Sequence, residues 1–321
     1  MIRVGVEESV EDIYLHDLST GIELVRLPAE PQEDIQIDFW IMSLSNGTSR
    51  RQAPHLKTLK VMQALTAGVD ALIDLVPAGV RLCDSRGVHD IPTAEWAVTA
   101  ILAMQKNLPF FCELQRNSDW SGKDGAEQIH LLARDAVPNP SCPVLVDEVA
   151  DKTILIVGYG AIGKAIEDRL APFGARFLRV ARSERPGVEP VSRLDELVPQ
   201  ADVVVLMTPL TSETHHLMNR SRIATMKPGA LLVNAARGAV VETEALASAL
   251  HEKRIRAVVD VTDPEPLPPT HPLWKAPNLL ITPHVATDSP MFTKRAFRFA
   301  LEQVGRYVRG EEPLNIVVGE Y

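Results

Sequence analysis

Three short polar stretches in the second half of the chain contain side chains suited to acid–base chemistry. They cover residues 234–238 (NAARG), 260–266 (DVTDPEP) and 283–286 (PHVA), and each follows a predicted apolar strand. In an open α/β sheet the ligand lies outside the carboxyl ends of the strands. We therefore expect the three stretches to converge on one site.

Arg237, Glu265 and His284 are the candidate catalytic residues of these stretches. An arginine can grip a carboxylate through two parallel hydrogen bonds. Histidine is the side chain that most readily gives up a proton near neutral pH, and a neighbouring carboxylate can orient its ring and favour the charged form. Taken singly, each residue also has an ordinary structural reading: a surface charge, a turn cap beside prolines, or a satisfied structural histidine.

A glycine-rich turn after a predicted strand indicates which ligand would bind beside these acid–base residues. Residues 153–163 read TILIVGYGAIG, and a helical pattern follows from Lys164. A strand that feeds a helix through G-x-G-x-x-G is typical of dinucleotide binding, with the diphosphate on the helix N-terminus. The three glycines serve a tight turn, close approach of the diphosphate, and helix–strand packing. The predicted cofactor contacts here are Gly158, Tyr159, Gly160, Ala161, Ile162 and Gly163. An ordinary glycine turn is the alternative.

The end of the next strand favours NADP over NAD. An acidic residue that holds the ribose 2′-hydroxyl of NAD is expected about 20 residues past the turn, and that position is Ala181. Arg182, Ser183 and Arg185 follow it and suit a 2′-phosphate. Glu184 keeps NAD possible, and a solvated loop is the structural alternative.

Together these features predict hydride transfer between a nicotinamide cofactor and the C2 carbon of a small 2-oxo or 2-hydroxy acid. Such a reaction needs a cation for the substrate carboxylate, a hydride donor and an acid for the carbonyl oxygen. Arg237, the dinucleotide and His284 would supply them, and Ala235, Ala236 and Ala286 are predicted cofactor contacts in the same stretches.

The elements that position these residues predict an α/β protein of two domains, each an open parallel sheet flanked by helices. Residues 1–90 form the smaller, substrate-binding lid domain, completed by residues 289–321, and residues 91–288 form a Rossmann dinucleotide-binding domain, where strands and helices alternate after the glycine turn. We expect strands at 2–6, 35–42 and 81–83 in the first domain. A helix is expected over 94–108, capped by Thr93 and ended by Pro109, and an extended arm over 117–146. A last helix over 292–309 is expected to pack on the first domain.

Composition excludes several classes of partner. A net charge of −9 and a pI near 5.5 argue against binding to nucleic acid or anionic membranes. The three cysteines, Cys83, Cys112 and Cys142, are widely spaced and predict neither a disulfide framework nor a metal site. Residues 1–9 carry charges and do not read as a signal peptide, so we expect a cytoplasmic protein.

Six motifs in order give the chain a family resemblance. LKVMQALTAGVDAL, GYGAIG, TPLTSETHHLMN, NAARG, DVTDPEP and ITPHVA resemble the D-isomer-specific 2-hydroxyacid dehydrogenases over nearly the whole chain. The resemblance implies that Arg237 anchors the substrate, that Glu265 and His284 form the acid–base pair, and that Asp260 faces the nicotinamide carboxamide. It also implies cofactor contacts from Thr208 and Pro209, and closure of the backbone of Ala67, Gly68 and Val69 on the substrate carboxylate.

Within that family, the 181–183 segment is similar to the NADPH-dependent glyoxylate and hydroxypyruvate reductases. The resemblance also implies a homodimer, to which the 117–146 arm would contribute. Trp96 departs from the pattern, because the family usually has a histidine after Ala94 and Glu95. Two alternatives stay open: an NAD-dependent phosphoglycerate or D-hydroxyacid dehydrogenase, and a nucleotide-sensing protein similar to the corepressors of this fold.

Overall fold

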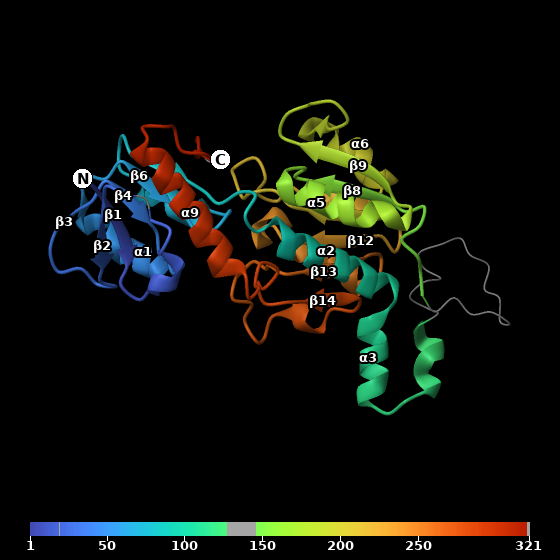
Figure 1. Cartoon of the computed structure of the whole chain (residues 1–321). Helices are drawn as coiled ribbons and strands as arrows, with labels where there is room; N and C mark the ends of the chain where they lie inside the picture. Colours follow the sequence, from blue (N-terminus) through green and yellow to red (C-terminus); the bar gives the residue numbers. More distant parts are fainter. Residues whose placement is uncertain (19, 127–145, 320–321) are drawn as a thin grey trace. The chain divides into compact units, whose positions relative to one another are not determined.

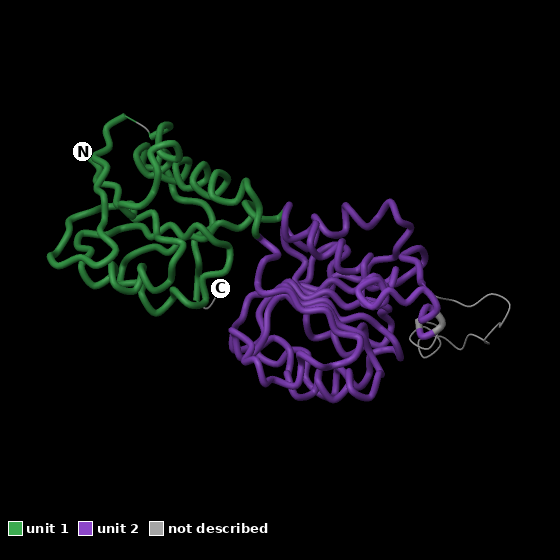
Figure 2. The backbone as a smooth tube through the Cα atoms, turned by 90° about the horizontal axis from the view of Figure 1, so that it is seen from below, with its two compact units in different colours: residues 1–90, 288–321 green, residues 91–287 purple. Residues whose placement is uncertain are grey.

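The chain folds into two compact units, each with its own parallel sheet (Figure 2). The computed structural model describes residues 1–18, 20–126 and 146–319. Unit 1 comprises residues 1–90 and 288–321, and unit 2 comprises residues 91–287. The second boundary thus lies one residue before the expected one.

Unit 2 is built on a seven-stranded sheet in which every pairing is parallel. The spatial order is β10-β9-β8-β11-β12-β13-β14, so the order reverses between β8 and β11. Ligands of doubly wound sheets bind at such a switch point. The strands are β8 (Thr153–Val157), β9 (Arg176–Ala181), β10 (Glu189–Pro190), β11 (Val203–Leu206), β12 (Leu231–Asn234), β13 (Arg256–Val259) and β14 (Leu279–Ile281).

Helices cover both faces of this sheet because its strands are apolar on both sides (Figure 1). In β8, Ile154 and Ile156 face the cluster that contains α2 and α5, whereas Leu155 and Val157 face α6, α7 and α8. The helices of this part of the chain are α2 (Asp90–Gln105), α3 (Leu108–Arg116), α5 (Ala161–Leu170), α6 (Leu194–Leu197), α7 (Arg220–Thr225) and α8 (Thr243–His251).

Unit 1 has a five-stranded parallel sheet in the order β2-β1-β4-β6-β7. Its strands are β1 (Ile2–Glu7), β2 (Ile22–Leu27), β4 (Phe39–Ile41), β6 (Val61–Gln63) and β7 (Arg81–Cys83), and β3 (Ile35–Gln36) pairs separately with β5 (Leu56–Lys57). The helices are α1 (Asn46–Gln52) and α9 (Phe292–Val308). Helix α9 returns from the far end of the sequence and packs Phe297, Leu301 and Val304 against Val4 and Phe39 of the sheet.

The fold class is the expected one, with helices flanking two parallel sheets, but two local expectations were wrong. The apolar run at 35–42 forms β3 and β4 in different sheets, because the backbone changes partner at Asp38. The N–H of Ile37 donates to Lys57 beside β5, whereas the N–H of Asp38 donates to Arg3 of β1, and the Asp38 carboxylate accepts from the N–H of Arg3 at 2.8 Å. Helix α2 starts at Asp90 and contains Thr93 as a buried residue, so Thr93 is not its cap.

Pro109 also behaves differently from the expectation. Asn107 adopts a left-handed conformation (φ 54°), α2 ends at Gln105, and Pro109 lies in the first turn of the new helix α3. Proline is tolerated there because the first turn of a helix leaves its N–H groups unbonded. The predicted arm therefore follows a second helix, and residues 127–145 of it lie outside the described residues. Within the described ranges, none of the helices has the length and apolar content needed to cross a bilayer.

Candidate active site

The glycine turn lies at the carboxyl end of β8, beside the switch point of the sheet. Gly158 has φ +95°, and a Cβ there would lie 2.5 Å from the carbonyl atoms of Met207, so only glycine fits. A Cβ on Gly163 would lie 2.9 Å from the carbonyl oxygen of Gly158, which reflects close helix–strand packing. Around Gly160, by contrast, no heavy atom lies within 4 Å of the Cβ position, which leaves room for a ligand.

A buried hydroxyl group marks the neighbouring strand end. Thr208 follows β11, and its Oγ1 is buried with no hydrogen-bond partner among the described residues. Buried polar atoms are normally bonded, so an orphaned one calls for an explanation such as a ligand. Because β11 pairs with β8, this hydroxyl group and the glycine turn belong to the same edge of the sheet. Their combination fits a dinucleotide whose diphosphate lies on the N-terminus of α5.

The segment after β9 carries exposed positive charge where the ribose would lie. Arg182, Ser183 and Arg185 are all exposed. Arg182 Nε lies 3.9 Å from a carboxylate oxygen of Glu213, and a guanidinium N–H of Arg185 donates to the carbonyl oxygen of Tyr159 in the glycine turn. Arg185 is thereby held next to the turn, and Ala181, at the strand end, carries no carboxylate.

Arg179, which lies within β9, makes a different contact. Arg179 Nε donates to Glu167 on α5 at 2.6 Å, and its Nη2 donates to the second oxygen of the same carboxylate. This bond keeps the pKa of Glu167 below its usual range. Arg179 thus ties β9 to α5, which leaves Arg182 and Arg185 as the exposed arginines of the segment after β9.

Arg237 lies in a loop shaped by the end of β12. The buried side chain of Asn234 accepts a hydrogen bond from the N–H of Ala236 and donates one to the carbonyl oxygen of Arg237, both at 3.0 Å. A Cβ on Gly238 would lie 2.0 Å from the carbonyl atoms of Thr262, so this loop packs directly on the one after β13. The Arg237 side chain is half-buried, and its Nη1 donates to the carbonyl oxygen of Ala236 at 2.8 Å.

His284 and Glu265 meet as the sequence predicts. The Nδ1 atom of His284 lies 2.6 Å from Oε1 of Glu265, and both side chains are about two-fifths exposed. An ionised carboxylate only accepts hydrogen bonds, so the proton of this contact belongs to Nδ1. That assignment leaves Nε2 as the ring nitrogen available to a reactant.

The backbone at His284 is unusual and is held by its neighbours. His284 has φ 55°, a left-handed conformation that is uncommon outside glycine. Its N–H donates to the carbonyl oxygen of Asp260 at 2.7 Å and to that of Thr282 at 3.1 Å. These two bonds hold the turn that follows β14 at His284.

Asp260 supports this turn with its side chain. The carboxylate is buried and accepts hydrogen bonds from the N–H groups of Val285 and Ala286 at 2.9 and 2.8 Å and from the hydroxyl group of Thr282 at 2.5 Å. Sequence reasoning missed Thr282 as a functional position. The available signal was a hydroxyl residue at a strand end, directly before the proline and histidine of the motif.

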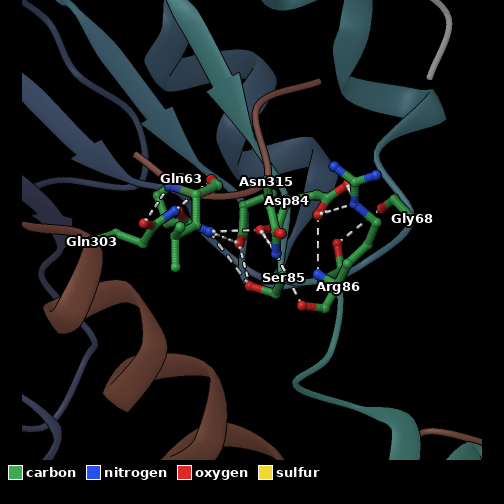
Figure 3. A network of polar contacts seen from close by, with 10 residues as sticks. Gln63, Gly68, Asp84, Ser85, Arg86, Gln303 and Asn315 are labelled. Carbon is green, nitrogen blue, oxygen red and sulfur yellow. Dashed lines mark hydrogen bonds and ion pairs between the residues drawn. The ribbon is translucent and has the colours of Figure 1, made fainter. Parts of the chain in front are cut away.

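Unit 1 carries the predicted substrate-contact loop, and a polar network holds it in shape (Figure 3). Thr66 Oγ1 donates to the carbonyl oxygen of Gly68 at 2.9 Å, and the N–H of Ser85 donates to the carbonyl oxygen of Thr66 at 3.0 Å. These bonds join the loop of residues 67–69, after β6, to the loop after β7. The network continues through Gln63, whose Oε1 accepts from Gln303 of α9 at 2.9 Å.

A fully buried carboxylate lies in this network. Asp84 is 0 % exposed, and its Oδ1 accepts hydrogen bonds from the N–H and Nε of Arg86 at 3.0 and 2.9 Å. Burial raises the pKa of Asp84, and the Arg86 contacts oppose that shift. The predicted site residues are thus divided: Ala67, Gly68 and Val69 belong to unit 1, and the cofactor and acid–base residues belong to unit 2. No metal-binding group of three His, Cys, Asp or Glu side chains is found among the described residues.

Comparison with known proteins identifies the family of the chain. The sequence profile of the D-isomer specific 2-hydroxyacid dehydrogenase NAD binding domain matches residues 98–286. A glyoxylate reductase of Thermofilum pendens is 35% identical over 269 residues, which cover 81% of this chain and 75% of that protein. A mouse glyoxylate reductase/hydroxypyruvate reductase is 36% identical over 239 residues, covering 71% of this chain and 68% of that one.

A solved structure extends the likeness to the complete chain. The D-isomer specific 2-hydroxyacid dehydrogenase from Xanthobacter autotrophicus Py2, in complex with NADPH and MES, superposes with a TM-score of 0.76 at 26% identity and covers 99% of this chain and 100% of its own. The sequence profile of one family thus matches residues 98–286, and a solved structure of the same family covers 99% of the chain. The glycine turn and the His284–Glu265 pair both lie within the matched residues. The protein belongs to the D-isomer-specific 2-hydroxyacid dehydrogenases, a family of oxidoreductases with a Rossmann NAD-binding domain.

Proposed function

We propose that the protein uses NADPH to reduce the C2 carbonyl group of a small 2-oxo acid of the glyoxylate or hydroxypyruvate class, giving a D-2-hydroxy acid. The observation that carries the proposal is the 2.6 Å contact between His284 and Glu265 at the end of β14, beside the strand ends that carry Arg237 and Asp260. The names of the Thermofilum and mouse relatives support the substrate class.

Each side chain has a defined task in this reaction. Arg237 binds the substrate carboxylate through two charge-assisted hydrogen bonds. The reduced nicotinamide, when bound, supplies the hydride. His284 gives the proton on Nε2 to the carbonyl oxygen, so that the new C–H and O–H bonds form together without an alkoxide. Glu265 stabilises the imidazolium before transfer and fixes the ring, and the exposed ring regains its proton from solvent.

The preference for NADPH is supported by charge. Arg182, Ser183 and Arg185 provide two cations and a hydroxyl group for a 2′-phosphate, and Ala181 offers no carboxylate to the 2′-hydroxyl group of NAD. Glu184 is the residue of this segment that favours the NAD alternative.

The direct test is turnover with and without the imidazole. Initial rates with NADPH and with NADH would be compared for glyoxylate, hydroxypyruvate, pyruvate and a phosphorylated 2-oxo acid. We expect the fastest turnover with NADPH and a small 2-oxo acid. His284→Ala should lower kcat by about 10²- to 10⁴-fold, the usual contribution of a positioned acid, with NADPH binding retained.

His251→Ala is the matched control, because His251 is an exposed histidine at the end of α8 and should be replaceable without loss of turnover. Unchanged turnover in His284→Ala would contradict the catalytic role. If NADPH binds and the wild-type chain turns over none of the substrates, the nucleotide-sensing alternative gains support.

We further propose that the protein is a homodimer of the cytoplasm. Helix α3 supports the first part, because it buries none of its residues although it includes Phe110 and Phe111, and Leu108 and Trp120 are 50% and 89% exposed. The thiols of Cys83 and Cys112, which are free in the structure, accord with a reducing compartment.

A further inference from the structure

Trp96 stands at the start of a directed chain of hydrogen bonds that ends at the turn carrying His284. Its indole Nε1 lies 3.1 Å from Oγ1 of Thr282, and that oxygen lies 2.5 Å from Oδ1 of Asp260. An indole N–H can only donate, and an ionised carboxylate can only accept. The single hydroxyl proton of Thr282 must therefore point to Asp260, while its oxygen accepts from Trp96.

Trp96 is itself held firmly enough to fix that hydroxyl group. It lies on α2 and packs on the buried cluster that includes Ile154 and Val205 of the sheet. A donor anchored by packing keeps Thr282 in one rotamer, since any other orientation of the hydroxyl group would leave the indole N–H without its acceptor. The contact joins residues 186 positions apart in the sequence.

The carboxylate at the end of the chain controls the backbone on both sides of the imidazole. Asp260 accepts from the N–H groups of Val285 and Ala286, and its own carbonyl oxygen accepts from the N–H of His284. Rotation of the carboxylate would therefore release the two residues that follow His284. The left-handed conformation of His284 persists only while its surroundings over-determine it.

We propose that Trp96 is a positioning residue, which acts through Thr282 and Asp260 to hold His284 at the angle required for proton transfer. The proposal rests on the function proposed above. Trp96 does not contact the reactants in this scheme. It orients the hydroxyl group of Thr282, which in turn holds the Asp260 carboxylate that supports the turn at His284. Loss of its N–H should affect the proton-transfer geometry, which appears in kcat, and leave substrate binding by Arg237 unaffected.

A double-mutant cycle tests whether Trp96 acts through Thr282. Trp96→Phe removes the N–H and keeps an aromatic ring, and we expect kcat to fall about two- to ten-fold, as for one neutral hydrogen bond, with KM for the 2-oxo acid within about two-fold of wild type. Thr282→Val should lower kcat by about ten- to a hundred-fold, because the buried carboxylate of Asp260 loses a hydrogen-bond donor. The kcat of the double variant should equal that of Thr282→Val alone, because Trp96 has no acceptor to act through once the hydroxyl group is gone.

Two controls separate this role from packing. Trp274→Phe also removes an indole N–H, one that donates to the carbonyl oxygen of Pro268 at 2.9 Å, and should leave kcat unchanged. Thr282→Ser keeps the hydroxyl group and should retain most of the activity. Equal losses from Trp96→Phe in the wild-type and Thr282→Val backgrounds would overturn the proposal, as would a change confined to KM.

Backbone hydrogen exchange gives a readout that is independent of activity. In the full chain, the N–H groups of Val285 and Ala286 should exchange about two- to ten-fold faster in Trp96→Phe than in wild type, and at the wild-type rate in Trp274→Phe. Unchanged exchange in Trp96→Phe would overturn the proposal even if the chain proved to have another substrate. Faster exchange in Trp96→Phe, combined with a wild-type chain that turns over no 2-oxo acid, would instead sustain the positioning of the turn and reject only the proposed function.

Discussion

Three carboxylates of this protein differ in what surrounds them, and their surroundings decide what each can do. Glu265 is partly exposed and lies against the ring of His284. Asp260 is buried among neutral donors and serves to hold a turn. Asp84 is fully buried beside the partly exposed Arg86, in the network next to the 67–69 loop. Glu265 is therefore open to solvent beside the His284 ring, whereas the two buried carboxylates are held by hydrogen bonds within the fold.

The raised pKa of Asp84 predicts how the stability of unit 1 depends on pH. A carboxyl group whose folded-state pKa lies above its unfolded value binds more protons in the folded state, so stability falls as pH rises through that range. Relative to Asp84→Asn, which does not titrate, the wild-type chain should lose free energy of unfolding as pH rises from about the ordinary value, 3.8, to the raised pKa. Urea unfolding at a series of pH values measures this difference.

Asp74 provides a control of opposite sign in the same unit. Its hydrogen bonds from Arg50 lower its pKa, so its contribution is present above the ordinary value and is lost as pH falls. Asp74→Asn should therefore give the reverse trend. A wild-type stability that rises with pH relative to Asp84→Asn would contradict the account of the buried carboxylate.

Loops that follow parallel strands supply nearly all the polar groups of the site. The turns after β8 and β11 bracket the switch point, and those after β12, β13 and β14 carry Arg237, Asp260 and His284 on neighbouring strands. The rigid sheet brings these loops together, although more than 100 residues separate the first from the last. In unit 1 the loops after β6 and β7 are likewise joined by the bond between Ser85 and Thr66.

The loop after β9 should decide which nicotinamide nucleotide binds. Replacement of Arg182 and Arg185 by alanine, singly and together, should weaken NADPH binding by about ten- to a hundred-fold, because charge-assisted bonds to the 2′-phosphate are lost. NADH affinity should stay within about two-fold. Fluorescence titration with both nucleotides measures the two dissociation constants.

Arg193→Ala is the control for this pair, since Arg193 is a partly exposed arginine of the same unit that bonds to Glu189 and Glu196 instead. If the double variant weakens the binding of NADPH and NADH equally, the arginines support the glycine turn, to which Arg185 is bonded, and do not bind the 2′-phosphate.

Each unit has its own hydrophobic core, with one cluster of buried side chains on each face of its sheet. Unit 1 depends on the last part of the chain, because α9 covers one face of its sheet and Gln303 binds both Gln63 and the carbonyl oxygen of Leu314. Helix α3, by contrast, buries none of its residues within the chain.

The exposed apolar side chains of α3 and of the segment after it predict self-association. Light scattering of the wild-type chain should give twice the 35.3 kDa of one chain, and replacement of Leu108 and Trp120 by serine should shift the mass toward that of one chain. Trp274→Ser removes another half-exposed tryptophan and should leave the mass unchanged. A wild-type mass of one chain would reject the homodimer.

The sequence by itself determined the glycine turn and the alternation of elements in unit 2, and it predicts the site residues. The sequence predicts strands at 154–157, 177–180, 203–207, 231–233, 257–260 and 279–282, and β8, β9, β11, β12, β13 and β14 each lie within one residue of these bounds. Parallel strands that are buried on both faces have mainly apolar sequences, which makes them visible in the sequence. The glycine spacing carries local information at Gly163, where a Cβ would meet Gly158 and Ile156, whereas a Cβ on Gly158 would meet Met207 of the neighbouring strand end.

Only the tertiary structure decided which distant groups act together. The limits of α2 depended on how Pro92, Asn107 and Pro109 fit their neighbours, and local propensity assigned the helix start and end wrongly. The bond from Trp96 to Thr282 and the burial of Asp84 depend on elements that meet across the fold, and no local pattern encodes such contacts. Periodicity and spacing report on neighbours in sequence, whereas Thr282, at the end of β14, accepts a hydrogen bond from a tryptophan on helix α2.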